Sequence, residues 1–216
     1  MTLKALTPGI AGGFVYINKW LPRLGPQHPA ALFPNPAPEA FSQYTHAPYP
    51  AAPGRVLVVA NRNAFAVTAL QKLGMQVHVR GLGGGSYCRV LPGDFDGCDA
   101  VVTMGKTVQY CLCAGVPVYV YGAYGVPGWL TEDNVERAAR SAFCGRGFPD
   151  KKSGGAAAEI RDGFARALDF QTARRESFIG RFSIGKVLPP LLESIGPRKI
   201  EPFSREYLSY VMRAGR

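Results

Sequence analysis

Hydrophobic residues in the middle of the chain follow two alternating patterns. Four short apolar runs predict β-strands, at residues 55–60, 75–80, 99–103 and 117–121. The first run is continuous and β-branched, as expected for a parallel strand that is covered on both faces. Between these runs, apolar residues at helical spacing predict helices over 64–73 and from Gly105 to a glycine stop at Gly115. Strands alternating with helices at these lengths predict an α/β fold, with a parallel sheet and helices on both faces.

The flanking parts of the chain have a different composition. Ten of the eighteen prolines lie in residues 1–53, which favours an extended arm with one short strand at 13–18. We expect this arm to pack on the core through Trp20, Leu21, Phe33 and Phe41. Residues 54–216 would then form a single domain. After the last strand, Thr131 is the expected N-cap of a helix to about Phe143, and further helices are expected at 156–168, 188–195 and 205–213.

Ligands of parallel α/β sheets bind beyond the carboxyl ends of the strands. The loops expected there are 61–63, 81–86, 104–107 and 122–130. The third carries Gly105, Lys106 and Thr107 at the start of a helix, where backbone amides and the helix dipole favour an anion. The alternative is a solvated lysine beside a threonine that caps the helix. Ala100 stands where a Walker motif requires glycine, which disfavours an ATP-hydrolysing loop.

Other candidate ligand residues each have an ordinary alternative. Asn61 and Arg62 follow the first strand and could contact a phosphate, or serve only in a turn. Residues 81–86 are glycine-rich and could form an anion-binding nest or a simple linker. Arg146 follows a glycine and either reaches an anionic ligand or is one of many surface arginines. No histidine or carboxylate occupies a position that indicates a catalytic acid or base, so the catalytic residues stay unknown.

Composition limits the class of protein. The chain has 216 residues and a formal charge of +10, of which residues 137–216 carry +8, with 16 basic and 8 acidic residues. This charge is compatible with an anionic small ligand, a peripheral contact with a lipid surface, or simply a basic surface. Without a nucleic-acid-binding motif, nucleic acid is disfavoured as a partner. The five cysteines are scattered and lack metal-ligand spacing, which indicates reduced core residues and no metal site. These cysteines and the absence of a long apolar run favour a cytoplasmic protein.

Several segments together suggest a family. The runs 101–110, 115–121, 125–130 and 143–147 (VVTMGKTVQY, GVPVYVY, GVPGWL and FCGRG) resemble the nucleotide-sugar-binding half of bacterial GT-B glycosyltransferases, which work on surface polysaccharides. The resemblance covers roughly residues 55–168. It implies a Rossmann-like domain that holds the donor diphosphate at Gly105, Lys106 and Thr107, with the nucleoside near the loop after Tyr121.

The resemblance implies a metal-independent transfer of sugar from a nucleoside-diphosphate donor to a glycan or lipid-linked acceptor. The donor is a substrate, and no other cofactor is expected. Two departures from the family motivate an alternative. The chain has the length of one such domain, where the family has two, and Gln109 stands where many relatives have a carboxylate. A partner subunit or a second copy could supply the missing half. The alternative is a non-catalytic partner module that keeps the fold.

Overall fold

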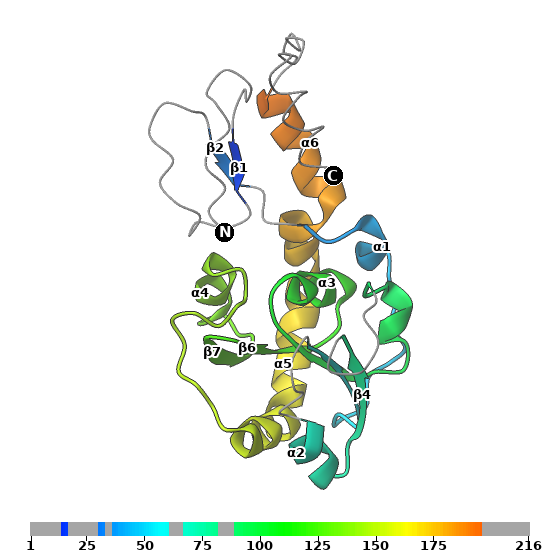
Figure 1. Cartoon of the computed structure of the whole chain (residues 1–216). Coiled ribbons are helices and arrows are strands. Elements are labelled where there is room, and N and C mark those ends of the chain that lie inside the picture. Colours follow the sequence, from blue (N-terminus) through cyan, green and yellow to red (C-terminus); the bar gives the residue numbers. More distant parts are fainter. Residues whose placement is uncertain (1–13, 17–29, 33–35, 61–66, 82–88, 196–216) are drawn as a thin grey trace, which may run out of the picture.

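The computed structural model describes residues 14–16, 30–32, 36–60, 67–81 and 89–195. Its central element is a five-stranded sheet in the order β4-β3-β5-β6-β7 (Figure 1). The strands are β3 (Arg55–Val59), β4 (Gln76–Arg80), β5 (Ala100–Thr103), β6 (Val118–Gly122) and β7 (Gly125–Trp129). The first four are parallel, and β7 pairs antiparallel with β6. This is a Rossmann-like α/β arrangement, as the sequence predicted.

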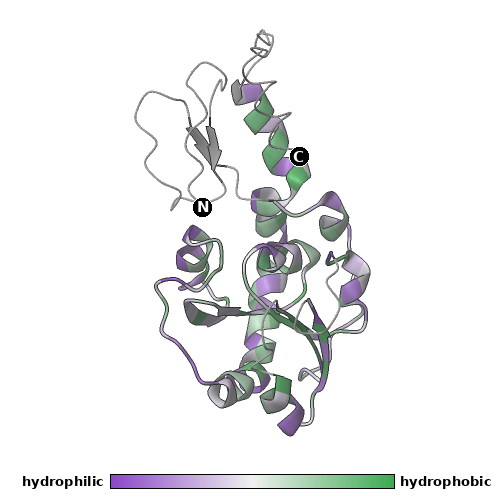
Figure 2. Cartoon of the chain, in the orientation of Figure 1, coloured by the Kyte–Doolittle hydropathy of each residue, from purple (hydrophilic) through white to green (hydrophobic). Residues whose placement is uncertain are grey.

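Helices cover both faces of the sheet because successive strand residues point to opposite sides. One face packs on α3 (Lys106–Ala114), α4 (Val135–Arg140), α1 (Glu39–Ser42) and the 3-10 turn η2 (Pro92–Phe95). The other face packs on α2 (Val67–Lys72) and the first part of α5 (Ser153–Phe182). Figure 2 shows hydrophobic and hydrophilic residues alternating along the helices that surround the sheet.

The long helix α5 contacts both apolar clusters. Ile160 and Phe164 belong to the cluster on the α2 face, whereas Phe178 and Phe182 belong to the cluster around α3. Gln171 is buried between these two stretches. Helix α6 (Ile184–Ile195) follows α5 and extends away from the sheet in Figure 1. A small parallel pair, β1 (Phe14–Tyr16) with β2 (Ala30–Leu32), completes the described elements.

Residues 36–54 form a strap that is part of the folded core. Phe41 is 1% exposed and its ring stacks on Tyr110 of α3 at 4.3 Å between centroids. Ala37 exchanges backbone hydrogen bonds with Phe182 and Ile184, at 2.7 and 2.8 Å. The expected packing of the arm through Phe41 is therefore confirmed, while Trp20, Leu21 and Phe33 lie outside the described residues.

The four predicted strands and the helix from Gly105 to Gly115 are confirmed within one or two residues. Three expectations were wrong. Residues 125–129 form a strand, which Pro127 and its two flanking glycines had concealed because they are rare in strands. Thr131 is no N-cap, because the helix begins at Val135 and the Asn134 side chain instead accepts a hydrogen bond from the Thr131 amide. The helix expected at 156–168 continues to Phe182.

The remaining C-terminal predictions have mixed outcomes. Helix α6 begins four residues before the expected start at 188, and it includes Pro189 and Pro190. The helix predicted at 205–213 lies outside the described residues. Among the helices that the structure describes, none combines the length and apolar character needed to cross a bilayer.

Candidate functional site at the carboxyl edge of the sheet

The strand order places a change of direction, a topological switch point, between β3 and β5. The chain leaves β3, forms β4 on one side of it, and then returns to form β5 on the other side. In open α/β sheets, ligands bind at this change of direction, beyond the carboxyl ends of the two strands. The Thr103 hydroxyl donates to the carbonyl of Val59 at 3.1 Å and so joins the two strand ends. Gly105 and the N-terminus of α3 come immediately after Thr103.

Gly105 makes the sharp turn from β5 into α3. Its φ of 68° and ψ of −135° favour glycine, and a Cβ there would meet no atom within 4 Å, so the side of the turn where a Cβ would project is open. Its amide donates to the carbonyl of Phe143 at 3.1 Å, which leaves that amide engaged within the protein. In an α-helix, the amides of Lys106 and Thr107 have no acceptor within the helix. The first turn of α3 contains no acidic residue that would compete with an anion.

A loop over residues 142–148 packs directly against this turn and against the β6–β7 hairpin. A Cβ on Gly122 would overlap the carbonyl of Cys144, and one on Gly145 would overlap the carbonyl of Gly125. The Tyr124 amide also donates to the Cys144 carbonyl at 3.3 Å. We call residues 142–148 the rim loop. A Cβ on Gly125 would likewise overlap the carbonyl of Phe148. Close backbone contacts at Gly122, Gly125 and Gly145 therefore hold the rim loop against the carboxyl edge of the sheet.

Two consecutive rim-loop residues have left-handed backbones without being glycine. Ala142 has a φ of 50° and Phe143 a φ of 57°. Such conformations cost about 1 kcal/mol or more per residue and persist where the surrounding structure holds them. The Phe143 ring is 1% exposed and packs edge-on against Phe182, at 5.9 Å between centroids. This anchor compensates for the backbone strain and aligns the Phe143 carbonyl with Gly105.

Two cationic side chains at this edge lie over aromatic rings. The Arg146 guanidinium lies 4.6 Å from the ring centroid of Tyr124, a residue that is 62% exposed. The Lys106 ammonium lies 5.5 Å from the ring centroid of Tyr110. Contacts of this kind restrict a long side chain without neutralising its charge. Lys106 and Arg146 therefore bring positive charge to the segments that surround the Gly105 turn.

Tyr121 lies on the other face of the sheet. Its half-buried ring packs against the cluster beneath α5, and its hydroxyl donates to the carbonyl of Lys151 at 2.6 Å. Burial raises the pKa of this hydroxyl, so it stays protonated at neutral pH. The hydroxyl is thus used in joining β6 to the segment before α5.

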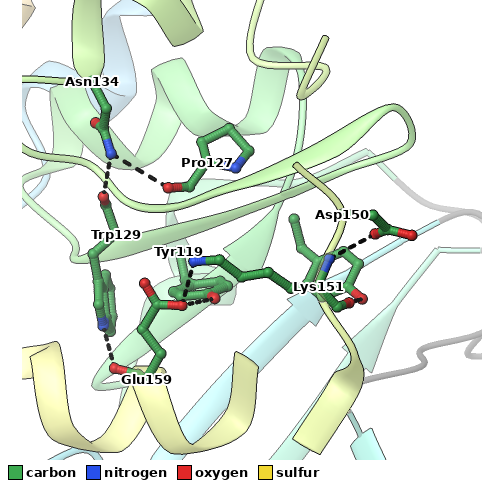
Figure 3. A network of polar contacts seen from close by, with 8 residues as sticks. Tyr119, Pro127, Trp129, Asn134, Asp150, Lys151 and Glu159 are labelled. Atoms are coloured by element: carbon green, nitrogen blue, oxygen red, sulfur yellow. Dashed lines mark hydrogen bonds and ion pairs between the residues drawn. The ribbon is translucent and has the colours of Figure 1, made fainter. Parts of the chain in front are cut away.

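A polar network next to Tyr121 connects β6 and β7 to α5 (Figure 3). The Glu159 carboxylate accepts hydrogen bonds from the Tyr119 hydroxyl at 2.7 Å and from the Lys151 ammonium at 2.6 Å. The Trp129 indole donates to the backbone carbonyl of Glu159 at 3.0 Å. Asn134 in turn donates to the carbonyls of Trp129 and Pro127.

This network has the properties of a structural contact. Burial, followed by the bond to Glu159, raises the pKa of Tyr119 far above its ordinary value, so the phenol remains a hydrogen-bond donor. Lys151 supplies the positive charge that balances Glu159. The Tyr119 hydroxyl is therefore not available as a base at neutral pH while these bonds persist.

The structure places the sequence candidates as follows. Gly105, Lys106 and Thr107 lie at the carboxyl edge, and the rim loop that carries Arg146 packs against the same turn. Tyr121 is the penultimate residue of β6, and its side chain lies on the face opposite α3. Asn61 and Arg62 lie outside the described residues, as does most of the 81–86 loop. Sequence reasoning missed Tyr124 and the anchoring role of Phe143, although two glycines flanking Arg146 were a signal of a tight turn.

No family model matches the chain, and no curated protein matches its sequence. Within the ranges that the structure describes, no three histidine, cysteine, aspartate or glutamate side chains gather in a way that could hold a metal ion.

Proposed function

We propose that the chain binds a nucleoside-diphosphate sugar at the carboxyl edge of its sheet, as the donor-binding part of a GT-B-type glycosyltransferase. The observation that carries this proposal is the Gly105 turn. It begins α3 beside the switch point between β3 and β5, with no acidic residue in the first helical turn. The resemblance of residues 101–110, 115–121, 125–130 and 143–147 to that family supports the same assignment.

The backbone amides and the cationic side chains of the site would have different roles in binding and transfer. The amides of Lys106 and Thr107 would donate hydrogen bonds to diphosphate oxygens, and the dipole of α3 would add positive potential. Lys106 and Arg146 would offset the charge that develops on the leaving diphosphate during sugar transfer. These groups could support departure of the diphosphate without a metal ion. The acceptor would be a glycan or a lipid-linked saccharide.

One observation favours the alternative, a module that binds without turnover. The segments 103–107, 121–125 and 142–149 contain no histidine, aspartate or glutamate, so none of them offers the imidazole or carboxylate that most often serves as a general base. If the chain acts in catalysis, the group that activates the acceptor hydroxyl must come from elsewhere, such as a partner subunit or a second copy.

Titration calorimetry with uridine and guanosine diphosphate sugars tests donor binding. We expect the Lys106→Ala variant to bind the preferred donor roughly 10- to 100-fold more weakly, because a charge-assisted hydrogen bond to phosphate is lost. Lys72→Ala is the matched control, since Lys72 is an exposed lysine at the end of α2, away from the carboxyl edge. Equal affinity in both variants, or no binding of any donor by the natural chain, would contradict the proposal.

A further inference from the structure

A second concave surface lies on the face of the sheet that carries α3, over the edge strand β4. Gln76, His78 and Arg80 alternate along β4 and line a hollow of about 530 Å³. The pairing register sets Arg55 opposite Gln76 and Leu57 opposite His78, so these side chains share one face. Asp94 and Asp96 line the hollow from the segment around η2.

The hollow exists because no described helix covers this part of the sheet. The connection from β4 to β5 would place a crossover helix over an ordinary α/β sheet. Its described part forms only the four-residue turn η2, whose Phe95 enters the core. On this face β4 carries the polar residues Gln76, His78 and Arg80, where a helix packed on the strand would require apolar ones.

A neighbouring, shallower depression of about 470 Å³ lies at the amino ends of the strands, beside the strap. The two hollows share Arg55 and Gln76, and the second is also lined by Pro48, Tyr49 and Asp99. We call the two together the β4 groove. It runs from the strap, at the amino ends of the strands, to Arg80, the last residue of β4. Arg80 therefore lies at the same edge of the sheet as the Gly105 turn.

The charge of the groove differs from that of the whole chain. Two arginines and three aspartates line it, a formal charge of −1 in a chain of +10. Four of the five charges form ion pairs, with 2.7 Å between Arg80 and Asp94 and 3.6 Å between Arg55 and Asp99. Such a groove would therefore contribute little electrostatic attraction to the binding of a polyanion.

The lining instead suits a ligand with many hydroxyl groups. Guanidinium and amide groups donate hydrogen bonds and carboxylates accept them, so neighbouring donors and acceptors can both be used by one hydroxylated ring. Leu57, Val79 and Cys98 are the apolar residues of the larger hollow, which offers few places for the side chains of a peptide. The larger hollow has the volume of a small-ligand site.

We infer that the β4 groove binds a neutral glycan chain. This assignment depends on the proposed function only for the role of the glycan, which would be the acceptor, lying along β4 with one end near the nucleotide edge. Binding of a glycan in the groove is a separate event from donor binding at Lys106, and the two can be measured separately.

The experiment uses the full chain labelled with nitrogen-15 and titrated with neutral hexasaccharides of glucose, mannose or N-acetylglucosamine, up to about 10 mM. We expect amide shifts centred on β4 with at least one of them. The Gln76→Ala/His78→Ala double variant should bind about 3- to 10-fold more weakly, because hydrogen bonds to the sugar are lost. Gln71→Ala, an exposed glutamine on α2, should bind like the natural chain.

Two further measurements distinguish glycan binding in the β4 groove from donor binding at Lys106 and from binding of a charged polymer. Lys106→Ala should keep glycan binding while losing donor binding, so failure of one proposal leaves the other measurable. A hexamer of galacturonic acid should bind more weakly than its neutral counterparts. The inference is overturned if none of the neutral glycans shifts the β4 amides, if the double variant binds them unchanged, or if only an extended neutral peptide occupies the groove.

Discussion

Gly145 lies where the rim loop meets the β6–β7 hairpin, and its lack of a side chain allows the contact. Its φ is 87°, and a Cβ there would overlap the Gly125 carbonyl. Gly147, two residues later, has a φ of 89° but open space around its Cβ position. The two glycines therefore share a backbone conformation and differ in what surrounds them.

This pair gives a controlled prediction. Gly145→Ala should lower the free energy of unfolding by about 3–5 kcal/mol, because both the backbone angle and the packing are violated. Gly147→Ala should cost about 1 kcal/mol, the strain of the left-handed backbone alone. Urea denaturation followed by circular dichroism measures both. Similar losses in the two variants would mean that the rim loop is not packed as described.

Sequence patterns identified some residues of the site and missed others. The Gly105 turn was predictable, because a glycine between an apolar run and a helical pattern is a strong local signal of a turn. The contact between Tyr124 and Arg146 was not, because it depends on how two loops 22 residues apart pack at the sheet edge. The left-handed Phe143 was equally hidden, since phenylalanine carries no local preference for that conformation.

Arg175 joins three elements through backbone carbonyls. Its guanidinium donates to Cys113 at the end of α3 and to Ser42 and Tyr44 in the strap, at distances of 2.7 to 3.1 Å. Arg174 is its neighbour on α5 and forms an exposed ion pair with Glu132. Buried carbonyls that lose their donor are costly, whereas exposed ion pairs contribute little.

The two arginines should therefore differ sharply when replaced. Arg175→Met should lower the free energy of unfolding by about 2–4 kcal/mol, since three carbonyls lose a charged donor. Arg174→Met should lower it by at most about 1 kcal/mol. Thermal unfolding at matched protein concentration measures the difference. The account of the strap is contradicted if Arg174 proves as important as Arg175.

Glu39 connects α1 to the start of α6. Its carboxylate accepts hydrogen bonds from the Ser183 hydroxyl at 2.7 Å and from the Gly185 amide at 3.2 Å. The bond from Ser183 is the largest cause that holds the pKa of Glu39 below its ordinary value of 4.5. A lowered pKa in the folded state means that stability is present above the unfolded pKa and is lost as the pH falls through the folded one.

A pH series tests this connection. At neutral pH, Glu39→Gln should be less stable than the natural chain, and the difference should shrink once the pH falls below the ordinary value of 4.5. Ser183→Ala should show a similar convergence at low pH. Unfolding in urea between neutral and acidic pH measures it, and a difference that grows on acidification would reverse the sign and refute the assignment.

The elements differ in how well the sequence predicted them. The parallel strands were found because their apolar runs are bounded by glycine or proline, and α3 because Gly105 and Gly115 mark both ends. Helix α5 was expected to be far shorter, since its second half, from about Asp169 to Phe182, is rich in charge and has only scattered apolar residues. Those residues pack on α3 and the strap, partners that no local pattern reveals.

For the molecule as a whole, part of the proline-rich arm belongs to the core of the sheet domain. Phe41 packs between Tyr110 of α3 and Phe95 of η2, with ring centroids 4.3 and 5.7 Å away. Its neighbour Gln43 is exposed. The fold class and the packing of Phe41 on the core followed from the sequence. Its ring partners did not, because a proline-rich segment has no periodicity that indicates which elements it contacts.

Phe41→Ala tests the contribution of the strap. We expect a loss of about 3–5 kcal/mol in the free energy of unfolding, as for other buried aromatic residues. Gln43→Ala should change it by less than about 0.5 kcal/mol. Denaturation followed by tryptophan fluorescence measures both. An unchanged midpoint in Phe41→Ala would mean that the strap contributes nothing to the stability of the core.

The central claim is that a nucleoside diphosphate binds at the Gly105 turn, and amide chemical shifts test it most directly. Uridine or guanosine diphosphate is added to the nitrogen-15-labelled chain, and the residues whose amides move are identified. The account predicts the largest saturable shifts at Lys106 and Thr107, with a further shift at Arg146. Shifts confined to other parts of the chain, or none with either nucleotide, would contradict it.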